Sequence, residues 1–246
     1  MRQVILSFVL STISCSFLLS QDLQTDIFKN DKHELKINFV GHASIFIELD
    51  GKITHIDPVF RMGDYLNYPK ADLILVTHHH SDHFDLNAIE ILKKDETKIV
   101  FTQECYEMVE NLSNIIIMKN EDVLRINHMT IEAVPAYNII HRNEHGTPYH
   151  PKGQGNGYII KTDFKTLYIA GDTEKIPEMK TFPKIDIAFL PANLPYTMSL
   201  EMVARVARII RPKIIYPYHY DYTQASTLKE LLKNQKNIEV RIKDMK

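Results

Sequence analysis

Thr77-His-His-His-Ser-Asp-His83 directly follows the short apolar run Asp72-Leu-Ile-Leu-Val76. The apolar run is typical of a buried strand, so the histidines stand where that strand is expected to end. His78 and His80, with one residue between them, can direct both rings at one cation, and Asp82 and His83 reach a second position close by. Imidazole and carboxylate ligands together suit zinc, iron or manganese. A solvated loop that holds histidines by chance is the alternative, but the spacing after a strand favours a metal site.

The composition of the 246 residues is that of a globular protein with a full core, since 44% are hydrophobic and 24% are charged. This length suits one large domain or two small ones. The formal net charge is only -2, so no broad basic surface argues for a nucleic-acid partner. The 12 histidines are a high count, and most of them lie in or near the motifs described here.

Residues 1–20 differ in kind from the rest, because a basic residue precedes a mostly apolar run from Val4 to Leu19. This pattern predicts a secretory signal peptide, cleaved after Ser20, and hence a protein exported to the periplasm or secreted. A lipoprotein signal with Cys15 as the lipidated residue, and an N-terminal anchor that stays attached, are the alternatives. Without the signal, Cys105 is the single cysteine, which excludes an intramolecular disulfide.

The remaining chain is predicted to form a polar leader, residues 21–34, and one domain, residues 35–246. Strands come in two sets, each followed by helices, and no linker rich in Gly, Ser or Pro separates them. The segment 135–157 is polar, holds three histidines and four glycines and has little periodicity, which is typical of a functional loop. Helices are expected over 85–94, 103–111, 199–210 and 225–234, and a last strand over 238–242.

These motifs together resemble the metallo-β-lactamase superfamily. Its metal-binding motif, H-x-H-x-D-H after an apolar strand, is matched by His78, His80, Asp82 and His83. The subgroup most similar to this chain contains small metal-dependent hydrolases such as ascorbate-phosphate lactonase and the phospholipase D that acts on N-acyl ethanolamine lipids. The resemblance covers nearly the whole chain after residue 34. Its other marks are Gly41-His-Ala43, Asp57-Pro58, Gly171-Asp-Thr173 and Pro217-Tyr-His-Tyr220.

The resemblance implies an α+β fold, an αββα sandwich of two mixed β-sheets flanked by helices, with metal at one edge between the sheets. It also implies two divalent metal ions, zinc first and manganese or iron as alternatives. His78 and His80 would hold the first ion. The second would be held by Asp82, His83 and His219, with Asp172 as a bridge between the two. Asp82 and Asp172 are therefore the predicted catalytic residues.

The chain departs from the lactonase-like pattern at one ligand. Those members carry a histidine shortly after the proline of a Pro-Ala turn, whereas Val134-Pro-Ala-Tyr-Asn138 has an asparagine there. Three outcomes are open: Asn138 binds directly, a histidine of the polar loop replaces the missing imidazole, or the first metal is weak or absent. The second is favoured, with His150 ahead of His141 and His145 because it precedes the return to the sheet.

Other motif residues are expected to support the ligands. Asp57 is placed to hydrogen-bond a ligand imidazole, and His42 can do likewise or cap the first strands. His79 is expected to point away from its neighbours. Tyr218 and Tyr220 could donate to a developing oxyanion or simply pack.

The predicted function is that of an exported metal-dependent hydrolase, in which a metal-bound hydroxide attacks a small ester, lactone or phosphodiester. A β-lactam is disfavoured, because the likeness is to the lactonase-like branch. A phospholipase D-like lipid hydrolase and a metal-binding protein without catalysis are the alternatives. The expected partner is a small-molecule substrate, and a membrane would be contacted only through an uncleaved signal or a lipid substrate.

Overall fold

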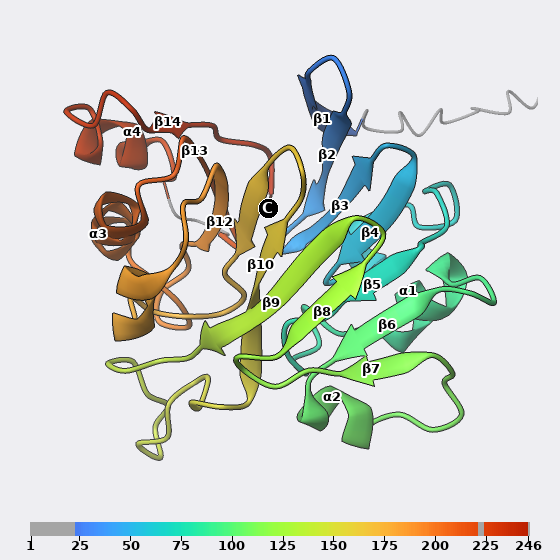
Figure 1. The fold of residues 1–246 in the computed structure, drawn as a ribbon. Coiled ribbons are helices and arrows are strands. Elements are labelled where there is room, and N and C mark those ends of the chain that lie inside the picture. The colour runs from blue at the N-terminus through green and yellow to red at the C-terminus, as the bar shows by residue number, and fades with distance from the viewer. Residues whose placement is uncertain (1–22, 221–223, 246) are drawn as a thin grey trace, which may run out of the picture.

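The computed structural model describes residues 23–220 and 224–245, which form two seven-stranded sheets. The first sheet has the order β1-β2-β3-β4-β5-β6-β7, and the second has the order β14-β13-β12-β11-β10-β9-β8. Each sheet therefore uses one continuous half of the chain, as the colours of Figure 1 show. The first sheet consists of β1 (Gln24–Lys29), β2 (Glu34–Gly41), β3 (Ser44–Leu49), β4 (Lys52–Ile56), β5 (Leu73–Leu75), β6 (Lys98–Phe101) and β7 (Ile115–Ile117).

The two halves repeat one topology. In each sheet the first four strands pair antiparallel, and the last three are added in parallel to the fourth. The strands of the second sheet are β8 (Val123–Ile126), β9 (Met129–Ala136), β10 (Gly155–Lys161), β11 (Thr166–Ile169), β12 (Ile187–Pro191), β13 (Ile214–Tyr218) and β14 (Glu239–Val240). Both sheets are thus mixed, as predicted.

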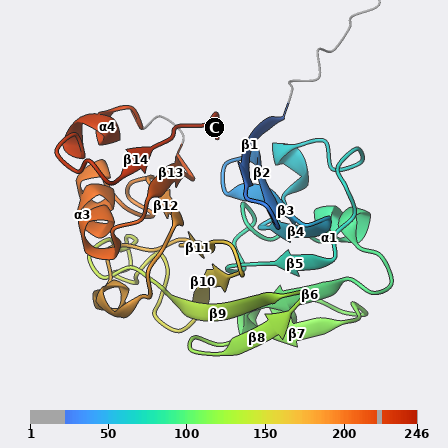
Figure 2. The same ribbon diagram turned by 45° about the horizontal axis from the view of Figure 1, so that its top comes forward.

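The helices lie outside the sheets, with α1 and α2 beside the first sheet and α3 and α4 beside the second (Figures 1 and 2). Alternation along β5 shows the layering, because Leu73 and Leu75 join the core between the sheets while Ile74 packs outward with Ile89 of α1. The predicted αββα sandwich is confirmed. The helical segments are η1 (Phe60–Met62), α1 (Leu86–Leu92), α2 (Gln103–Glu107), η2 (Pro177–Thr181), α3 (Leu200–Ile210) and α4 (Thr227–Leu231).

The segment expected to be a leader belongs to the first sheet. Within residues 21–34, β1 pairs antiparallel with β2 over its whole length, from Gln24 opposite Phe39 to Lys29 opposite Glu34. The domain therefore begins before residue 35. Polar composition concealed this strand because β1 is an edge strand in which four side chains are exposed and two are half-buried. The signal peptide predicted over residues 1–20 lies outside the described residues.

Among residues 23–220 and 224–245, no helix is both long enough and apolar enough to cross a membrane. The longest, α3, has 11 residues and packs its apolar face on the second sheet.

Asp26 on β1 ties this edge strand to the C-terminal segment. Its carboxylate accepts hydrogen bonds from the Tyr216 hydroxyl, from Arg241 Nη1 at 3.0 Å and from Lys243 Nζ at 2.5 Å. Burial alone would raise the pKa of Asp26, but the bonds from Lys243, Tyr216 and Arg241 outweigh it and lower the pKa.

We expect Asp26→Asn to lower the free energy of unfolding by about 1–3 kcal/mol at neutral pH, because it weakens hydrogen bonds to a charged group. Since the folded-state pKa is depressed, this stability is present above the unfolded pKa and is lost as the pH falls through the folded value. Denaturant titrations at pH 7 and at about pH 3 should therefore show that the difference in free energy of unfolding between the parent and Asp26→Asn is smaller at the lower pH. The exposed Asp163, changed to Asn, is the matched control. Equal stability of Asp26→Asn and the parent at pH 7 would contradict the role.

Candidate metal centre

The chain brings its histidine motifs together on loops at one edge of the two sheets. The stretch after β5 turns tightly, since the backbone N–H groups of His83 and Phe84 both donate to the His80 carbonyl, at 2.9 and 2.8 Å. This turn places His83 back beside His78, with ring centroids 4.1 Å apart. The second sheet supplies the other side chains from the loop before β10, the turn after β11 and the end of β13: His150, Asp172 and His219.

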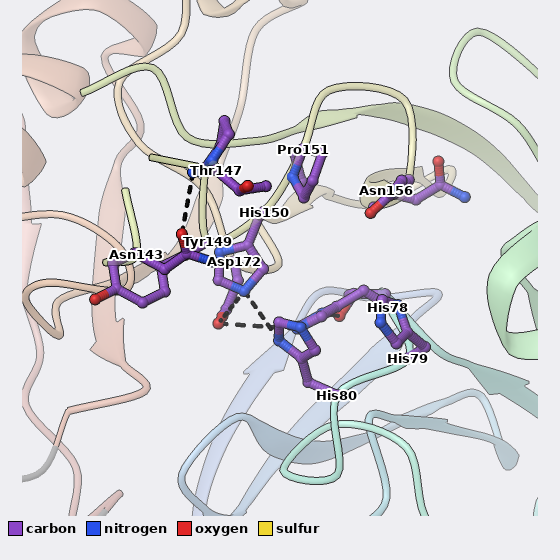
Figure 3. Close-up of a pocket in the computed structure, with 15 residues that line it drawn as sticks. His78, His79, His80, Asn143, Thr147, Tyr149, His150, Pro151, Asn156 and Asp172 are labelled. Atoms are coloured by element: carbon purple, nitrogen blue, oxygen red, sulfur yellow. Dashed lines mark hydrogen bonds and ion pairs between the residues drawn. The ribbon is translucent and has the colours of Figure 1, made fainter. Parts of the chain in front are cut away.

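A first group of possible ligands consists of His78, His80 and His150, each of which offers one ring nitrogen within 4.8 Å of the others. His150 Nε2 lies 3.2 Å from His80 Nδ1 and 3.2 Å from Asp172 Oδ2. Figure 3 shows the three labelled side chains of His80, His150 and Asp172 pointing toward one another. The structure thus places His150, the favoured substitute from the polar loop, with the two histidines of the motif.

A second group consists of Asp82, His83, His219 and, in addition, His42. His42 Nε2 lies 3.1 Å from Asp82 Oδ2, and His219 Nε2 lies 3.4 Å from the same oxygen. His42 was expected only to support the ligands or cap a strand, so its place among them is a finding of the structure. The backbone fixes this pair: His219 N donates to the His42 carbonyl at 2.8 Å, and both residues adopt positive φ.

Asp172 lies between the two groups. Its Oδ1 is 3.3 Å from His83 Nε2, and its Oδ2 is 3.2 Å from His219 Nε2 and 3.9 Å from His78 Nε2. The turn that holds it needs Gly171, which has φ +62°, and a Cβ there would lie 2.8 Å from the Asn156 carbonyl oxygen. One carboxylate therefore reaches imidazoles of both groups.

The buried polar atoms of the cluster fit a cation. His78 Nε2, His83 Nε2, Asp172 Oδ1 and both ring nitrogens of His219 are buried without a hydrogen-bond partner among the described residues. Unpaired buried polar atoms are costly and uncommon. Imidazole and carboxylate donors suit zinc and related divalent ions. A metal ion would satisfy these atoms, so the residues present fit the metal that the sequence predicts.

The charge states also fit. Burial lowers the pKa of His80 to about 4 and that of His78 well below its usual value, with help from the neighbouring imidazoles, so both rings are neutral and able to ligate. Burial alone would raise the pKa of Asp172, but His219 and His83 outweigh it and hold the carboxyl ionised. Burial would likewise lower the pKa of His219, yet Asp172 raises it to about 9. Without a metal, His219 thus retains a proton, and a bound metal cation would take the place of that proton.

Asp57 supports the second group from behind. Its carboxylate is fully buried, lies 2.8 Å from His83 Nδ1 and accepts from the backbone N–H and the hydroxyl of Thr77, both at 2.7 Å. This contact directs His83 Nε2 at Asp172 and Asp82, the supporting role expected for Asp57.

Asn138, predicted as a possible direct ligand, uses its amide differently. Its Oδ1 accepts from the backbone N–H of His150 at 2.9 Å and lies 2.7 Å from His150 Nδ1. With Nδ1–H as the donor, His150 presents Nε2 to the first group. In this geometry the Asn138 oxygen is engaged by His150, which favours His150 over Asn138 as the predicted substitute ligand.

Glu174, which the sequence analysis missed, organises the same loop. Its buried carboxylate accepts from three successive backbone N–H groups, of Ile139, Ile140 and His141, at 2.7 to 2.9 Å. It also accepts from Asn138 Nδ2 at 3.2 Å. Its position two residues after Asp172 was the available signal.

The other candidate side chains face elsewhere. His141 Nδ1 lies 2.6 Å from Glu174 Oε1, and the His145 side chain is 80% exposed, so neither joins the first group. The Tyr218 hydroxyl accepts from Gly171 N at 2.9 Å, and the Tyr220 hydroxyl donates to the Lys243 carbonyl. The tyrosines therefore stabilise the fold around the site and do not face a substrate.

Two cavities open onto the cluster. One, of about 230 Å³, is lined by the first group and by neutral polar side chains such as Asn143 and Gln154 (Figure 3). The other, of about 420 Å³, is lined by Asp82 and His219 of the second group. His80, Tyr149, His150 and Asp172 line both. A small molecule in either cavity would lie against the metal centre.

Comparison with known proteins agrees with this geometry. The family described as "Beta-lactamase superfamily domain" matches residues 36–219. The chain therefore belongs to the metallo-β-lactamase superfamily. Within it, a UPF0173 metal-dependent hydrolase of Nanoarchaeum equitans is 34% identical over 191 residues, covering 76% of this chain and 84% of that protein.

Solved structures show the same relationship. A protein of Parabacteroides distasonis described as a metal-dependent hydrolase has a TM-score of 0.85 and 44% identity, with 91% of this chain and 100% of the other covered. Igni18, a metallo hydrolase of Ignicoccus hospitalis, has a TM-score of 0.72 and 25% identity over 86% and 95% of the two chains. The narrower likeness to ascorbate-phosphate lactonase stays a prediction.

Proposed function

We propose that this protein is a dinuclear metal-dependent hydrolase of small esters, lactones or phosphodiesters. The observation that carries the proposal is Asp172, whose two oxygens face imidazoles of two separate ligand groups beside open cavities. His78, His80 and His150 would hold one ion, and Asp82, His83, His219 and His42 the other. Zinc is the first candidate, because the donors are mainly imidazole.

The bound metals would supply an activated water and polarise a carbonyl or phosphoryl oxygen. The chain's own residues set the conditions for this chemistry. Asp172 stays ionised among buried imidazoles, and Asp57 fixes the ring of His83. Asp82, whose side chain is 31% exposed, lines the larger cavity. Burial alone would raise the pKa of Asp82, but hydrogen bonds from His219 and His42 outweigh it and lower the pKa, so the carboxylate is ionised and able to ligate.

Two alternatives are weaker on structural grounds. A phospholipase D-like activity needs an apolar groove, whereas the residues that line the larger cavity are mainly histidines, carboxylates and other polar residues, with Met62, Tyr149 and Tyr196 as the apolar or aromatic members. A purely metal-binding protein does not explain two substrate-sized cavities that meet at the ligands.

Metal removal and restoration test the proposal. The protein is stripped with a chelator, reloaded separately with Zn²⁺, Mn²⁺ and Fe²⁺, and assayed on 4-nitrophenyl esters, γ-lactones and bis(4-nitrophenyl) phosphate. We expect about two metal ions per chain in the active form, a loss of turnover of at least about a hundredfold on stripping, and recovery with one of the three ions. A loaded protein that binds two ions and turns over none of these substrates would support the non-catalytic reading.

We further propose that residues 1–20 direct export, which stays a prediction from the sequence pattern. Fractionation of the natural host, with N-terminal sequencing of the recovered protein, tests it. A periplasmic or secreted chain that begins near residue 21 is expected, whereas an intact N-terminus in the cytoplasmic fraction contradicts it.

A further inference from the structure

Arg61 is the one arginine or lysine among the described residues that line the larger cavity. It lies on η1, in the loop between β4 and β5, and so falls in sequence between His42 and His80, which line the same cavity. The lining also includes Met62, Tyr149 and Tyr196, and the two tyrosine rings pack edge to face with centroids 5.0 Å apart. The cavity thus combines a fixed cation and aromatic surface with the metal centre.

The backbone around Arg61 is held on both sides. Phe60 N donates to Asp85 Oδ2 at 2.8 Å, and Met62 N donates to the Val59 carbonyl at 2.9 Å. Val59 N in turn donates to the hydroxyl of the buried Tyr65 at 3.1 Å. The position of the Arg61 Cα is therefore set by hydrogen bonds to the rest of the loop and to the N-cap of α1, although the side chain itself is exposed.

The Arg61 guanidinium makes no hydrogen bond or ion pair within residues 23–220 and 224–245. Arg241, by contrast, is paired with Asp26 and Glu239, and Arg142 and Arg208 donate to backbone carbonyls. An unpaired guanidinium presents five donors in a fixed plane that matches carboxylate and phosphate oxygens. No residue within 23–220 or 224–245 therefore neutralises its charge, which faces the cavity.

The smaller cavity lacks such a charge. Apart from the histidines and Asp172, its polar lining is neutral: Thr77, Asn143, Thr147, Gln154 and Asn156. The two cavities meet at His80, His150 and Asp172, where the scissile group of a substrate would lie. A substrate that extends from this point into the larger cavity would bring its remote end toward Arg61.

We propose that Arg61 makes the protein selective for substrates with an anionic group, a carboxylate or a phosphate monoester, on the arm that enters the larger cavity. This inference rests on the proposed hydrolase function. The contact is remote from the scissile bond, so it stabilises the bound substrate and the transition state alike and acts through KM. An exposed contact of this kind is also screened by salt.

Three 4-nitrophenyl esters of comparable chain length test the proposal: the uncharged pentanoate, the glutarate half-ester and 4-phosphonooxybutanoate. The metal-loaded parent is compared with Arg61→Gln, Arg61→Lys and the control Arg125→Gln. Arg125 is an exposed arginine on β8 that lines neither cavity, so its replacement removes the same charge elsewhere.

We expect the parent to prefer the charged esters and Arg61→Gln to lose that preference by about threefold to fivefold in kcat/KM, mainly through KM. Arg61→Lys should retain part of the preference for the charged esters, and Arg125→Gln should retain all of it. About 0.5 M salt should weaken this preference in the parent. Comparison of the two charged esters shows which anion fits better. Equal kcat/KM for all three esters in the parent, or an unchanged preference in Arg61→Gln, would overturn the role of Arg61 and leave the hydrolase intact. Absence of turnover on every substrate class would instead overturn the proposed function on which the inference rests.

Discussion

Asp172→Asn is expected to lose both bound metal and turnover. The substitution removes the negative charge that lies 3.2 to 3.3 Å from nitrogens of His83, His150 and His219 and replaces one oxygen by an amide nitrogen that cannot ligate. Loss of a supporting partner of a metal ligand costs about 10–100-fold in affinity or activity. Replacement of a residue that faces both groups should cause a larger loss, so kcat/KM of Asp172→Asn is expected to fall by at least about a hundredfold.

Metal content per chain by elemental mass spectrometry and kcat/KM on the best substrate measure this effect. Asp57→Asn provides a graded comparison, because Asp57 contacts His83 only from behind and should cause a smaller loss. Asp163→Asn is the control for an exposed aspartate, and circular dichroism checks that each variant is folded. If Asp172→Asn kept both its metal and its turnover, the proposal that Asp172 is needed for metal binding and catalysis would be wrong.

For the proposed dinuclear site, His150→Ala is expected to release the ion of the first group and to leave the ion of the second group bound. His150 supplies one of the three nitrogens of that group, and the two that remain, from His78 and His80, make a weak site. The metal content should fall from about two ions toward one, with turnover reduced by at least about tenfold. The exposed His145, changed to Ala, is the matched control from the same loop.

Asn138→Ala and Glu174→Gln separate ligation from support. Both leave His150 in place but remove a member of the chain Glu174–Asn138–His150, so they should weaken metal affinity without abolishing it. Excess metal in the assay should therefore restore turnover in these two variants more fully than in His150→Ala. Equal metal content in His150→Ala and the parent would remove His150 from the site.

The sequence was sufficient for those parts of the site that are local in the chain. His78, His80, Asp82 and His83 share one loop after one strand, and their spacing alone indicates a metal site with two neighbouring positions. The turn at His80 that brings His83 back toward His78 then follows from two backbone hydrogen bonds. The two-layer fold was predictable from the resemblance to the metallo-β-lactamase superfamily, whereas the pattern of strands and helices alone indicates only an α+β protein.

The remaining parts depend on contacts between distant residues. His42 and His219 are hydrogen-bonded through their backbones although 177 positions of sequence separate them, and no local pattern records that contact. Glu174 acts on a loop more than 30 residues before it. The role of Asn138 depends on the position of His150, which the sequence does not give. Likewise, β1 is recognised as a strand only from its pairing with β2.

Because the chain divides into two sheets, activity at the metal centre can report whether two separate fragments of the chain have assembled. Each sheet and its ligands come from one continuous piece, with His42, His78, His80, Asp82 and His83 before β8, and His150, Asp172 and His219 after it. A nick at the exposed Glu121, between β7 and β8, would separate the two pieces without cutting a strand. Neither fragment holds a full ligand set, so recovered catalysis from co-expressed fragments would measure their reunion directly, without a fused fluorescent or enzymatic tag.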